Sequence, residues 1–376
     1  MVFTKPYKSC TISTVYYYDR VIKLKAVIAM SGGVDSSVAA CIMKERGYEV
    51  CGITLKLFDN DEIGIEKSKT CCSLDDVMDA RRVADSLGMP FYVFNFGDRF
   101  SDLVIDKFVN TYIEGGTPNP CIDCNRFIKF NELLKRAHAL DFEYIVTGHY
   151  ARISKEGDRY LLKKAVDTNK DQSYVLYFMS QHQLSKTIFP LGELTKPEVR
   201  EIAGKYGFVN ADKPESQDIC FVREGKYADF IENYTGIKSK PGSFVNPEGH
   251  EVGRHKGIIH YTTGQRRGLG LSVEKPVYVC GKNPQENTVT VGSEDYLFTK
   301  ELVASDINLI AFDSINSPER VFAKTRYRQK EEAAVIEQIG DDKIHVSFEK
   351  PQRAVTRGQA VVFYRDDVVV GGGTIE

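Results

Sequence analysis

The sequence contains no tryptophan, no excess of charge of either sign and no long apolar run. Its 50 lysines and arginines nearly balance 52 aspartates and glutamates, for a net charge of −2. This balance excludes an attraction of the whole chain to a polyanion, so any nucleic-acid surface must be a local patch. Because no stretch approaches about 18 consecutive apolar residues, we expect no membrane-spanning helix.

Cysteine is present, but not in the pattern of a disulfide-stabilised secreted domain. Nine cysteines, an odd number, are spread over 376 residues. This favours a reducing compartment, the cytoplasm, with a few thiols kept for chemistry. The length exceeds the usual size of a single hydrophobic core, so two or three domains are expected. The oligomeric state stays open, with a monomer as the working expectation.

Residues 1–22 are expected to form an N-terminal extension outside the fold. They contain Lys5, Lys8 and Arg20, several hydroxyl residues and one acid, Asp19. The composition also fits a weak transit peptide. Because the segment has no clear amphipathic arginine stripe, the extension is the preferred interpretation.

The first informative stretch is a glycine loop between an apolar run at residues 24–29 and a helix-like segment at residues 34–46. The loop reads Ala29, Met30, Ser31, Gly32, Gly33, Val34, Asp35 and Ser36. A strand, a tight turn and a helix N-terminus together direct several backbone N–H groups toward one place, which suits a phosphate. The lysine of the Walker pattern is absent. The loop resembles that of the N-type ATP pyrophosphatases, which bind ATP and transfer AMP.

Strands and helices alternate through the first part of the chain. Strands are expected at residues 24–29, 50–57, 91–96 and 144–147, and helices at 34–46, from Ser73, at 98–113 and at 127–138. This alternation predicts an α/β fold with a doubly wound parallel sheet. The resemblance implies the adenine nucleotide alpha hydrolase-like version of it. Ligands of such sheets bind at the carboxyl ends of the strands, where the loop lies.

Residues 117–125 place two cysteines behind two prolines. Pro118 and Pro120 favour an extended, rigid path with little helix potential, and a helix is expected where this stretch ends. Cys124 would then lie at or next to a helix N-terminus, where the dipole lowers the pKa of a thiol. We therefore infer a reactive cysteine. A zinc site is not indicated, because no second pair of ligands lies at short spacing.

A distal cysteine completes the pattern. Cys220 lies in a polar loop and by itself would be interpreted as a small buried hydrophobe. In combination, the loop at 29–36, the stretch at 118–125 and the Asp-Ile-Cys-Phe run at 218–221 resemble the tRNA-specific 2-thiouridylases. Further runs that resemble segments of this family occur at residues 147–150, 170–174, 261–270, 326–328 and 371–373.

The resemblance implies a reaction. ATP would bind the loop residues together with Leu55 and Gly148, and Mg²⁺, held through Asp35, would neutralise the triphosphate. ATP would adenylate C2 of the wobble uridine of tRNA, releasing pyrophosphate. Sulfur transfer from a cysteine persulfide would then give 2-thiouridine and AMP.

The resemblance also implies the residues that handle sulfur and tRNA. Cys220 would carry a persulfide received from a sulfur-donor protein. Cys124 would attack it, releasing hydrosulfide or forming a Cys124–Cys220 disulfide that a reductant resets. The residues expected to contact tRNA are Asn119, Pro120, Cys121, His149, Lys170, Asp171, Gln172, Arg326, Tyr327 and Gln359.

Beyond residue 220, short alternating runs with turn residues replace the helices, apart from one helix at residues 227–234. This predicts two small β-rich modules, a central domain and a C-terminal β-barrel. The expected segments are the extension at 1–22, the catalytic domain at 23–224, the central domain at 225–292 and the barrel at 293–376.

Each β-rich module carries a basic patch that the net charge conceals. Residues 252–268 contain no acid and four bases, Arg254, Lys256, Arg266 and Arg267. In the barrel module, cations recur at every second position: Lys324, Arg326, Arg328 and Lys330. On a strand these would share one face and form a row. An ordinary solvated face would mix charge signs, so RNA contact is the preferred interpretation.

Three alternatives remain. Cys121 stands where many members of the family have an aspartate, so Cys121, Cys124 and Cys220 are a suitable ligand set for a [4Fe–4S] cluster. A ligase of the same superfamily that adenylates a carboxylate would need the loop but neither catalytic cysteine. A non-catalytic RNA-binding protein would need only the β-rich modules, and the intact loop argues against it.

Overall fold

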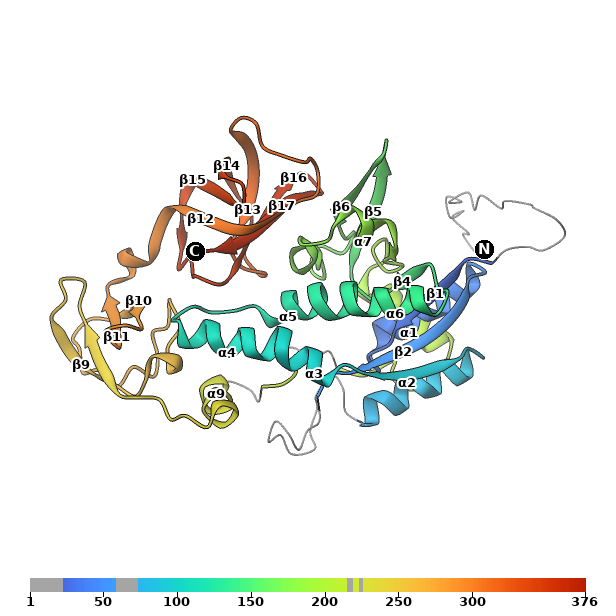
Figure 1. The fold of residues 1–376 in the computed structure, drawn as a ribbon, viewed down its shortest axis with the longest axis horizontal. Coiled ribbons are helices and arrows are strands. Elements are labelled where there is room, and N and C mark those ends of the chain that lie inside the picture. The colour runs from blue at the N-terminus through green and yellow to red at the C-terminus, as the bar shows by residue number, and fades with distance from the viewer. Residues whose placement is uncertain (1–22, 59–73, 215–218, 223–225) are drawn as a thin grey trace.

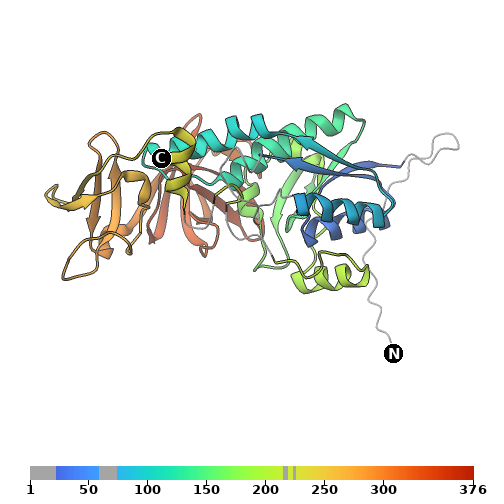
Figure 2. The ribbon, with the colours of Figure 1, turned by 90° about the horizontal axis from the view of Figure 1, so that it is seen from below.

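The computed structural model describes residues 23–58, 74–214, 219–222 and 226–376. The predicted extension at 1–22 and Ser73 lie outside these ranges. Figure 1 shows an α/β domain at one end, a small β domain at the other and a barrel between them. The view from below in Figure 2 shows the same elongated arrangement. Among the described residues, no helix combines the length and apolarity needed to cross a membrane.

Five parallel strands form the sheet of the α/β domain, in the order β3-β2-β1-β4-β7. They are β1 (Lys25–Ala29), β2 (Glu49–Lys56), β3 (Phe91–Asn95), β4 (Tyr144–Val146) and β7 (Thr187–Ile188). β1 lies between β2 and β4, so the order of strands reverses beside it, which is where doubly wound sheets bind ligands. The predicted fold class and the four predicted strands are confirmed, whereas β7 was not expected.

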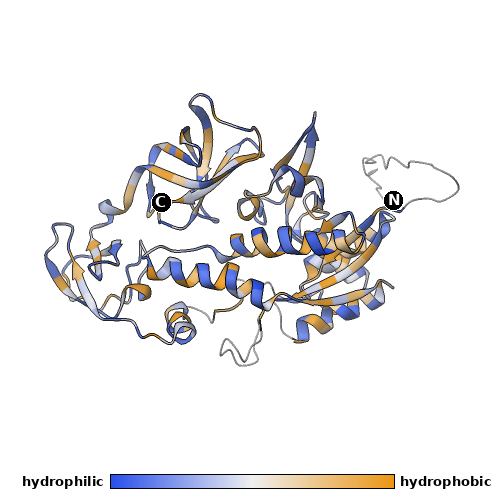
Figure 3. Ribbon diagram, in the orientation of Figure 1, coloured by the Kyte–Doolittle hydropathy of each residue, from blue (hydrophilic) through white to orange (hydrophobic). Residues whose placement is uncertain are grey.

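Side chains of β1 alternate between two hydrophobic clusters, one on each face of the sheet. Val27 packs in the cluster that contains Phe108, whereas Ala26 and Ile28 pack in the cluster that contains Val38. The second cluster is covered by α1 (Val34–Glu45), α2 (Leu74–Ser86) and α8 (Lys196–Lys205). Two long helices cover the first, and apolar and polar residues alternate around them in Figure 3.

Each long helix contains a π-helical stretch. The first joins α3 (Gly97–Phe100), π-helical η1 (Ser101–Ile105) and α4 (Asp106–Ile113). The second joins α5 (Pro120–Asp123), π-helical η2 (Cys124–Glu132) and α6 (Leu133–Ala139). The shorter helical segments are α7 (Gln181–Ser185), η3 (Ser173–Leu176), η4 (Ile258–His260) and η5 (Glu294–Leu297).

The second long helix begins earlier than expected. Pro120 is its first residue, and the side chain of Asn119 caps it by accepting from the Ile122 amide. A proline costs no hydrogen bond at this position, because its missing N–H would have no helical partner. The prediction that Cys124 lies at or next to the helix N-terminus is therefore wrong, since the helix begins four residues earlier. Cys124 lies in the second turn, and since the dipole acts mainly on the first turn, the dipole argument does not apply to it.

Two β-rich domains follow α9 (Tyr227–Thr235), as predicted. The central sheet has the order β10-β11-β8-β9 and packs around Phe244. Its strands are β8 (Gly242–Val245), β9 (Glu251–His255), β10 (Tyr278–Asn283) and β11 (Thr288–Gly292). The C-terminal barrel closes because β12 pairs with both β15 and β17. Its strands are β12 (Phe298–Leu309), β13 (Glu319–Lys324), β14 (Glu332–Gly340), β15 (Lys343–Arg353), β16 (Ala360–Arg365) and β17 (Val368–Ile375).

A hairpin of the α/β domain extends the sheet of the barrel. It consists of β5 (Ala151–Glu156) and β6 (Arg159–Lys164). β6 pairs with β17 at Lys163 and Val368, which makes one sheet of eight strands. Beneath it, Leu162 and Tyr174 of the α/β domain share a buried cluster with Tyr364 of the barrel. The two domains are therefore joined through both a backbone ladder and a common core.

Candidate active site

The loop at residues 29–36 follows β1 and opens directly into α1, as predicted. Gly33 is the N-cap of α1, and no side chain of the described residues caps it. The hydroxyls of Ser36 and Ser37 donate to the Gly33 carbonyl at 3.0 and 3.1 Å, which holds the turn closed. The first N–H groups of α1 are thus available to an anion, and the turn offers a backbone site for phosphate.

Gly32 lets the loop pack directly against α2. Its φ is +73°, and a Cβ at this position would lie 2.3 Å from the carbonyl oxygen of Asp76. We expect Gly32→Ala to lower the free energy of unfolding by at least about 1–2 kcal/mol from backbone strain. The displaced loop should also lose ATP binding. Urea denaturation without nucleotide and titration calorimetry with ATP measure the two effects.

Gly33 provides the matched control for this substitution. Its φ is −88°, and the nearest atom to a Cβ added there is 3.5 Å away. Gly33→Ala should therefore leave the unfolding free energy of the nucleotide-free protein nearly unchanged. Equal losses of stability in the two variants would contradict the role assigned to Gly32.

Asp35 is held by a lysine that the sequence analysis did not single out. The Lys196 ammonium, from the first turn of α8, contacts the two carboxylate oxygens of Asp35 at 2.7 and 2.9 Å. The Tyr150 hydroxyl donates to Asp35 Oδ1 at 2.8 Å. The Lys196 side chain is 8% exposed, so water screens the pair only weakly. Lys196 contacts both oxygens of Asp35, so a Mg²⁺ ion held through Asp35 would have to compete with this ammonium, and the Mg²⁺ site stays a prediction.

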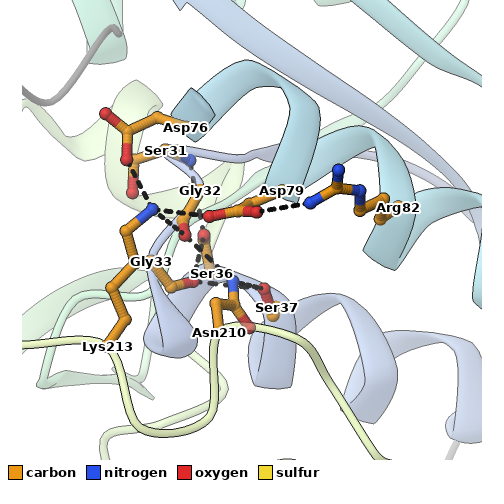
Figure 4. A network of polar contacts seen from close by, with 10 residues as sticks. All are labelled: Ser31, Gly32, Gly33, Ser36, Ser37, Asp76, Asp79, Arg82, Asn210 and Lys213. Carbon is orange, nitrogen blue, oxygen red and sulfur yellow. Dashed lines mark hydrogen bonds and ion pairs between the residues drawn. The ribbon is translucent and has the colours of Figure 1, made fainter. Parts of the chain in front are cut away.

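A second lysine contacts the loop, as Figure 4 shows. The Lys213 ammonium lies 2.7 Å from Asp76 Oδ1 and 2.7 Å from Asp79 Oδ2, and 3.4 Å from the Gly32 carbonyl oxygen. Arg82 contacts the other oxygen of Asp79 at 3.3 Å. Two cations, Lys196 and Lys213, therefore lie at the loop, each held by carboxylates.

The other predicted nucleotide residues converge on the same end of the sheet. A Cβ on Gly148 would lie 2.8 Å from the carbonyl carbon of Asp35 and from the Ser36 nitrogen, so the turn after β4 lies directly against the loop. Leu55 is buried near the end of β2. The geometry suits one nucleotide site, and the contacts of these residues with ATP stay a prediction.

His149 is buried, although it was expected to contact tRNA. The side chain is 9% exposed, and its ring lies 5.9 Å from the rings of both Phe130 and Phe189. Nδ1 shares a hydrogen bond of 2.7 Å with the Thr147 hydroxyl. Burial lowers the pKa of His149 well below 6.5, and the positive charge of Lys129 adds to this effect. A contact with tRNA would require the ring to leave this packing.

The buried His149 should make stability fall in mild acid. Below pH 6.5 the unfolded chain binds a proton at His149 that the folded protein does not. Folding then loses up to about 1.4 kcal/mol per pH unit from this residue until the pH reaches the folded-state pKa. His149→Gln should remove that part of the slope in denaturation curves. Above pH 6.5 the gap between variant and wild type should stay constant, and equal acid slopes would refute the effect.

The two cysteines predicted to be catalytic pack into one apolar cluster. Cys124, the first residue of η2, is 8% exposed in the cluster of the long helices, and Cys220 packs against the same cluster. Cys121 lies in the preceding turn and is exposed. The described residues, which include all three cysteines, hold no group of three His, Cys, Asp or Glu able to bind a metal ion. The arrangement therefore does not fit the [4Fe–4S] alternative.

The segment before Cys124 is held by the barrel. The Gln359 amide donates to the carbonyls of Thr117 and Pro118 at 2.8 and 3.1 Å. Asn119 is half-buried, and Pro120 is buried at the helix start. Gln359, predicted to contact tRNA, thus also positions the segment on which three other predicted tRNA contacts lie.

Two further segments predicted to contact tRNA lie side by side, although the sequence separates them widely. The ring of Tyr174 lies 6.0 Å from that of Tyr327, across the junction between the α/β domain and the barrel. Asp171 and Gln172 accept hydrogen bonds from backbone amides of their own domain, which fixes the loop on the α/β side of this junction. Tyr327 is exposed, and the half-buried members of the group are Lys170 and Arg326.

The predicted row of cations along one strand is wrong. β13 ends at Lys324, and the chain then turns, with the Gln329 side chain accepting from the Thr325 amide and hydroxyl at 3.1 and 2.8 Å. Lys324 is buried against two tyrosine rings. Because a hairpin turn breaks the period of two, the four side chains do not share a face. The cations of the central patch are all exposed: Arg254, Lys256, Arg266 and Arg267.

Family models match almost the whole described chain. Residues 24–224 match a tRNA methyl transferase HUP domain, residues 228–293 a tRNA methyl transferase PRC-barrel domain and residues 299–375 an aminomethyltransferase beta-barrel domain. Among solved structures, a 4-thiouridine synthetase–RNA complex with bound ATP gives a TM-score of 0.33 at 18% identity. The match covers 54% of this chain and 46% of the chain in that structure, and a likeness of this size is too weak to support an inference.

Relatives are similar over nearly their full length. The tRNA-specific 2-thiouridylase MnmA 1 of Clostridium botulinum is 50% identical over 355 residues, which are 94% of this chain and 100% of the relative. MnmA of Clostridioides difficile is 49% identical over a match that covers 94% of this chain and 98% of that relative. MnmA 1 of Thermoanaerobacter pseudethanolicus is 52% identical over the same shares. These matches confirm the resemblance seen in the motifs, and the chain belongs to the family of tRNA-specific 2-thiouridylases.

Proposed function

We propose that this protein replaces the C2 oxygen of the wobble uridine of tRNA by sulfur and consumes ATP in doing so. One observation carries the proposal beyond family membership. An uncapped phosphate loop occurs in the same domain as two cysteines, Cys124 and Cys220, which pack in one cluster although 96 positions separate them in the sequence. The loop serves activation, and the cysteines serve sulfur transfer.

Activation comes first because the C2 oxygen is a poor leaving group. That oxygen attacks the α-phosphorus of ATP bound at the loop, and a new P–O bond forms while the bond to pyrophosphate breaks. Negative charge develops on the departing pyrophosphate. The N–H groups at the start of α1, with the cations Lys196 and Lys213 beside the loop, are suited to stabilise it.

Sulfur arrives as a persulfide on Cys220, loaded by a sulfur-donor protein. The terminal sulfur attacks C2, and AMP leaves with the original oxygen. The Cys124 thiolate then attacks the Cys220 sulfur, which releases 2-thiouridine and leaves a Cys124–Cys220 disulfide. Alternatively, Cys124 attacks first and the released hydrosulfide attacks C2. Both routes end in the same disulfide, which a dithiol reductant must reduce before the next cycle.

The wobble base must leave its stack to reach the cysteines. The residues expected to meet it are Asn119, Pro120 and Cys121, which immediately precede Cys124 and are held in place by Gln359 through Thr117 and Pro118. The exposed cations of the central patch suit the phosphate backbone, which fixes orientation rather than base identity.

Neither Mg²⁺ nor a [4Fe–4S] cluster, the two inorganic groups considered from the sequence, is assigned a step in this reaction. Magnesium commonly accompanies a triphosphate, but Asp35, the acid expected to hold it, is engaged by Lys196. A [4Fe–4S] cluster is not favoured, because the described residues contain no three-ligand metal group. Iron and acid-labile sulfide analysis of anaerobically purified protein should find neither, and stoichiometric amounts of both would reverse this choice.

The decisive experiment measures pyrophosphate release from ATP with and without tRNA. We expect release only with tRNA that carries an unmodified wobble uridine, and none when cytidine replaces that uridine. Release without tRNA would instead indicate a ligase that adenylates a carboxylate. Methylated tRNA with no pyrophosphate would indicate the methyl transfer that the description of the family model names.

A further inference from the structure

Lys282 joins the central domain to the α/β domain. It lies on β10, and its ammonium donates to the Gly116 carbonyl of the α/β domain at 3.2 Å and to the Tyr261 carbonyl of its own domain at 3.0 Å. The ring of Tyr112, from α4, lies 5.9 Å from the same nitrogen. Figure 1 shows the C-terminal end of α4 beside the central domain. One side chain thus bridges two domains through two backbone carbonyls.

The charge of Lys282 is not compensated by an acid. Among the described residues no carboxylate acts on its charge, and burial alone lowers the pKa of Lys282 to about 8. A group with this pKa is still mostly protonated at neutral pH. Removing an ammonium from water without an opposite charge is costly, and an apolar side chain would avoid that cost. Stability alone therefore does not account for a lysine here, whereas its bonds to two carbonyls do.

The carbonyl of Gly116 belongs to the segment that leads to the proposed base contacts. The next two carbonyls, those of Thr117 and Pro118, accept from Gln359 of the barrel at 2.8 and 3.1 Å. Three consecutive carbonyls are therefore held by side chains of the other two domains, the first by Lys282 and the following two by Gln359. The path of the chain into the cysteine helix depends on both β-rich domains.

Backbone packing makes this contact with the central domain a close one. Gly115 has a φ of +80°, and a Cβ added to it would lie 3.1 Å from Cγ of Pro284 and 3.5 Å from Cβ of Lys282. The chain thus passes directly against the end of β10, with no room for an intervening side chain. A shift of β10 would move Gly115 and the residues that follow it.

The second carbonyl held by Lys282 opens the run at residues 261–267, which carries two exposed cations of the central patch. The same strand supports this run further along. Val279 of β10 accepts from the Gly264 amide at 2.8 Å and donates to the Gln265 carbonyl at 2.9 Å. The run that offers cations to a phosphate backbone is therefore tied to β10 at Tyr261, Gly264 and Gln265.

We infer that Lys282 positions the base-contact segment relative to the cations that dock the tRNA backbone. The inference rests on the proposed function and adds a positioning residue to it. When phosphates bind the run at 261–267, β10 and Lys282 fix where Gly116 lies, and with it residues 119–124. Lys282 touches neither the base nor the sulfur in this role. Its effect falls on how accurately the wobble base meets the reacting groups, a placement to which rates are very sensitive.

The test separates tRNA binding from turnover in Lys282→Met, which keeps the length of the side chain but donates no hydrogen bond. At saturating tRNA, the maximal rate of pyrophosphate release should fall about 10- to 100-fold. The Kd for tRNA should change by less than about threefold, because the exposed cations remain. Arg266→Ala should show the opposite split, with tRNA binding weakened about three- to tenfold and a near-normal maximal rate. A Lys282→Met variant with a wild-type maximal rate would overturn the inference.

Two further variants exclude a role in stability alone. Lys282→Arg keeps a cationic donor and should retain part of the maximal rate. Lys240→Met removes an exposed lysine that precedes β8 and should behave like wild type. Thermal unfolding of Lys282→Met is followed in parallel. If its loss of rate tracks the unfolded fraction and disappears at a temperature at which the variant is fully folded, Lys282 only stabilises the protein and the inference is wrong.

Hydrogen–deuterium exchange tests the bridge itself without tRNA or ATP. Peptides that cover residues 114–119 should exchange faster in Lys282→Met than in wild type, whereas peptides from α1 should exchange at the same rate. No change at 114–119, or an equal acceleration in α1, would refute a local hold by Lys282. Wild-type pyrophosphate release with tRNA is measured alongside. Its absence would refute the proposed function, whereas a normal wild-type value together with unchanged exchange in Lys282→Met isolates the failure to Lys282.

Discussion

Cys220→Ser should abolish sulfur incorporation into tRNA, by about 1000-fold or more, while tRNA-dependent pyrophosphate release stays within a few-fold of wild type. Serine retains the volume of the side chain but cannot carry a persulfide, so the adenylated base forms without a sulfur to attack it. Parallel assays with radiolabelled sulfur donor and with labelled ATP separate the two steps. Cys124→Ser should release no 2-thiouridine either: the sulfur should stay on Cys220, as a disulfide adduct with C2 of the base if the persulfide attacks directly, or as a persulfide if Cys124 must first release hydrosulfide.

Cys280→Ser is the matched control for both variants. Cys280 is half-buried in β10 of the central sheet, away from the cluster of Cys124 and Cys220, and its substitution should leave both assays unchanged. If either Cys124→Ser or Cys220→Ser still incorporated sulfur at the wild-type rate, the assignment of the two cysteines would be wrong even though the enzyme adenylated tRNA.

The second large effect is expected at the buried ion pair of the loop. Lys196→Met should lower the rate of tRNA-dependent pyrophosphate release by about 100- to 1000-fold. The substitution leaves the Asp35 carboxylate without its cation at the place where phosphates bind, so a repulsion replaces a neutral pair. Initial rates at several ATP concentrations show whether the loss falls on the maximal rate or on ATP affinity.

Two further variants decide why activity is lost. Lys205→Met removes an exposed lysine from the other end of α8 and should have no effect. Adding Asp35→Asn to Lys196→Met should recover part of the activity if repulsion by the bare carboxylate is the cause, since the paired substitution removes both charges. A fully active Lys196→Met variant would show that the pair serves stability alone.

The parts of the fold that the sequence predicts are those fixed by local rules. β1, β2 and β4 are predicted because buried parallel strands appear as short apolar runs, and β3 has the same apolar signal although it is a largely exposed edge strand. The turn at Gly32 was expected because a left-handed residue before a helix is readily supplied by glycine. Loop and strand together predict a nucleotide site at the carboxyl end of β1.

The errors arise where one local rule admits two outcomes. Pro120 was interpreted as a residue that prevents a helix, yet proline also begins one, and Asn119 supplies the cap. The recurrence of cations from Lys324 to Lys330 has the period of a strand, but it carries no information on where β13 ends. In both cases the hydrogen bonds of one neighbouring side chain, Asn119 or Gln329, decide the path.

The residues missed altogether act through contacts distant in sequence. Lys196 meets Asp35 across 161 positions, and Lys213 meets Asp76 across 137. The only local signal at Lys196 is the helix start marked by Thr195 and Glu198, which places a lysine in a first turn but says nothing of its partner. Pairings of this kind depend on how helices α1, α2 and α8 come to lie beside one another.

The hairpin formed by β5 and β6 has a consequence for biosynthesis. Its inner strand, β6, pairs with β17, since Lys163 lies opposite Val368, 205 positions later. While the chain is being made, β6 presents an unpaired edge, and the apolar side chains beneath it lack the neighbours that the barrel supplies. We therefore expect the α/β domain to reach its final packing only after β17 has been made. A fragment ending near residue 224 would expose an adhesive strand, although its nucleotide loop would be complete.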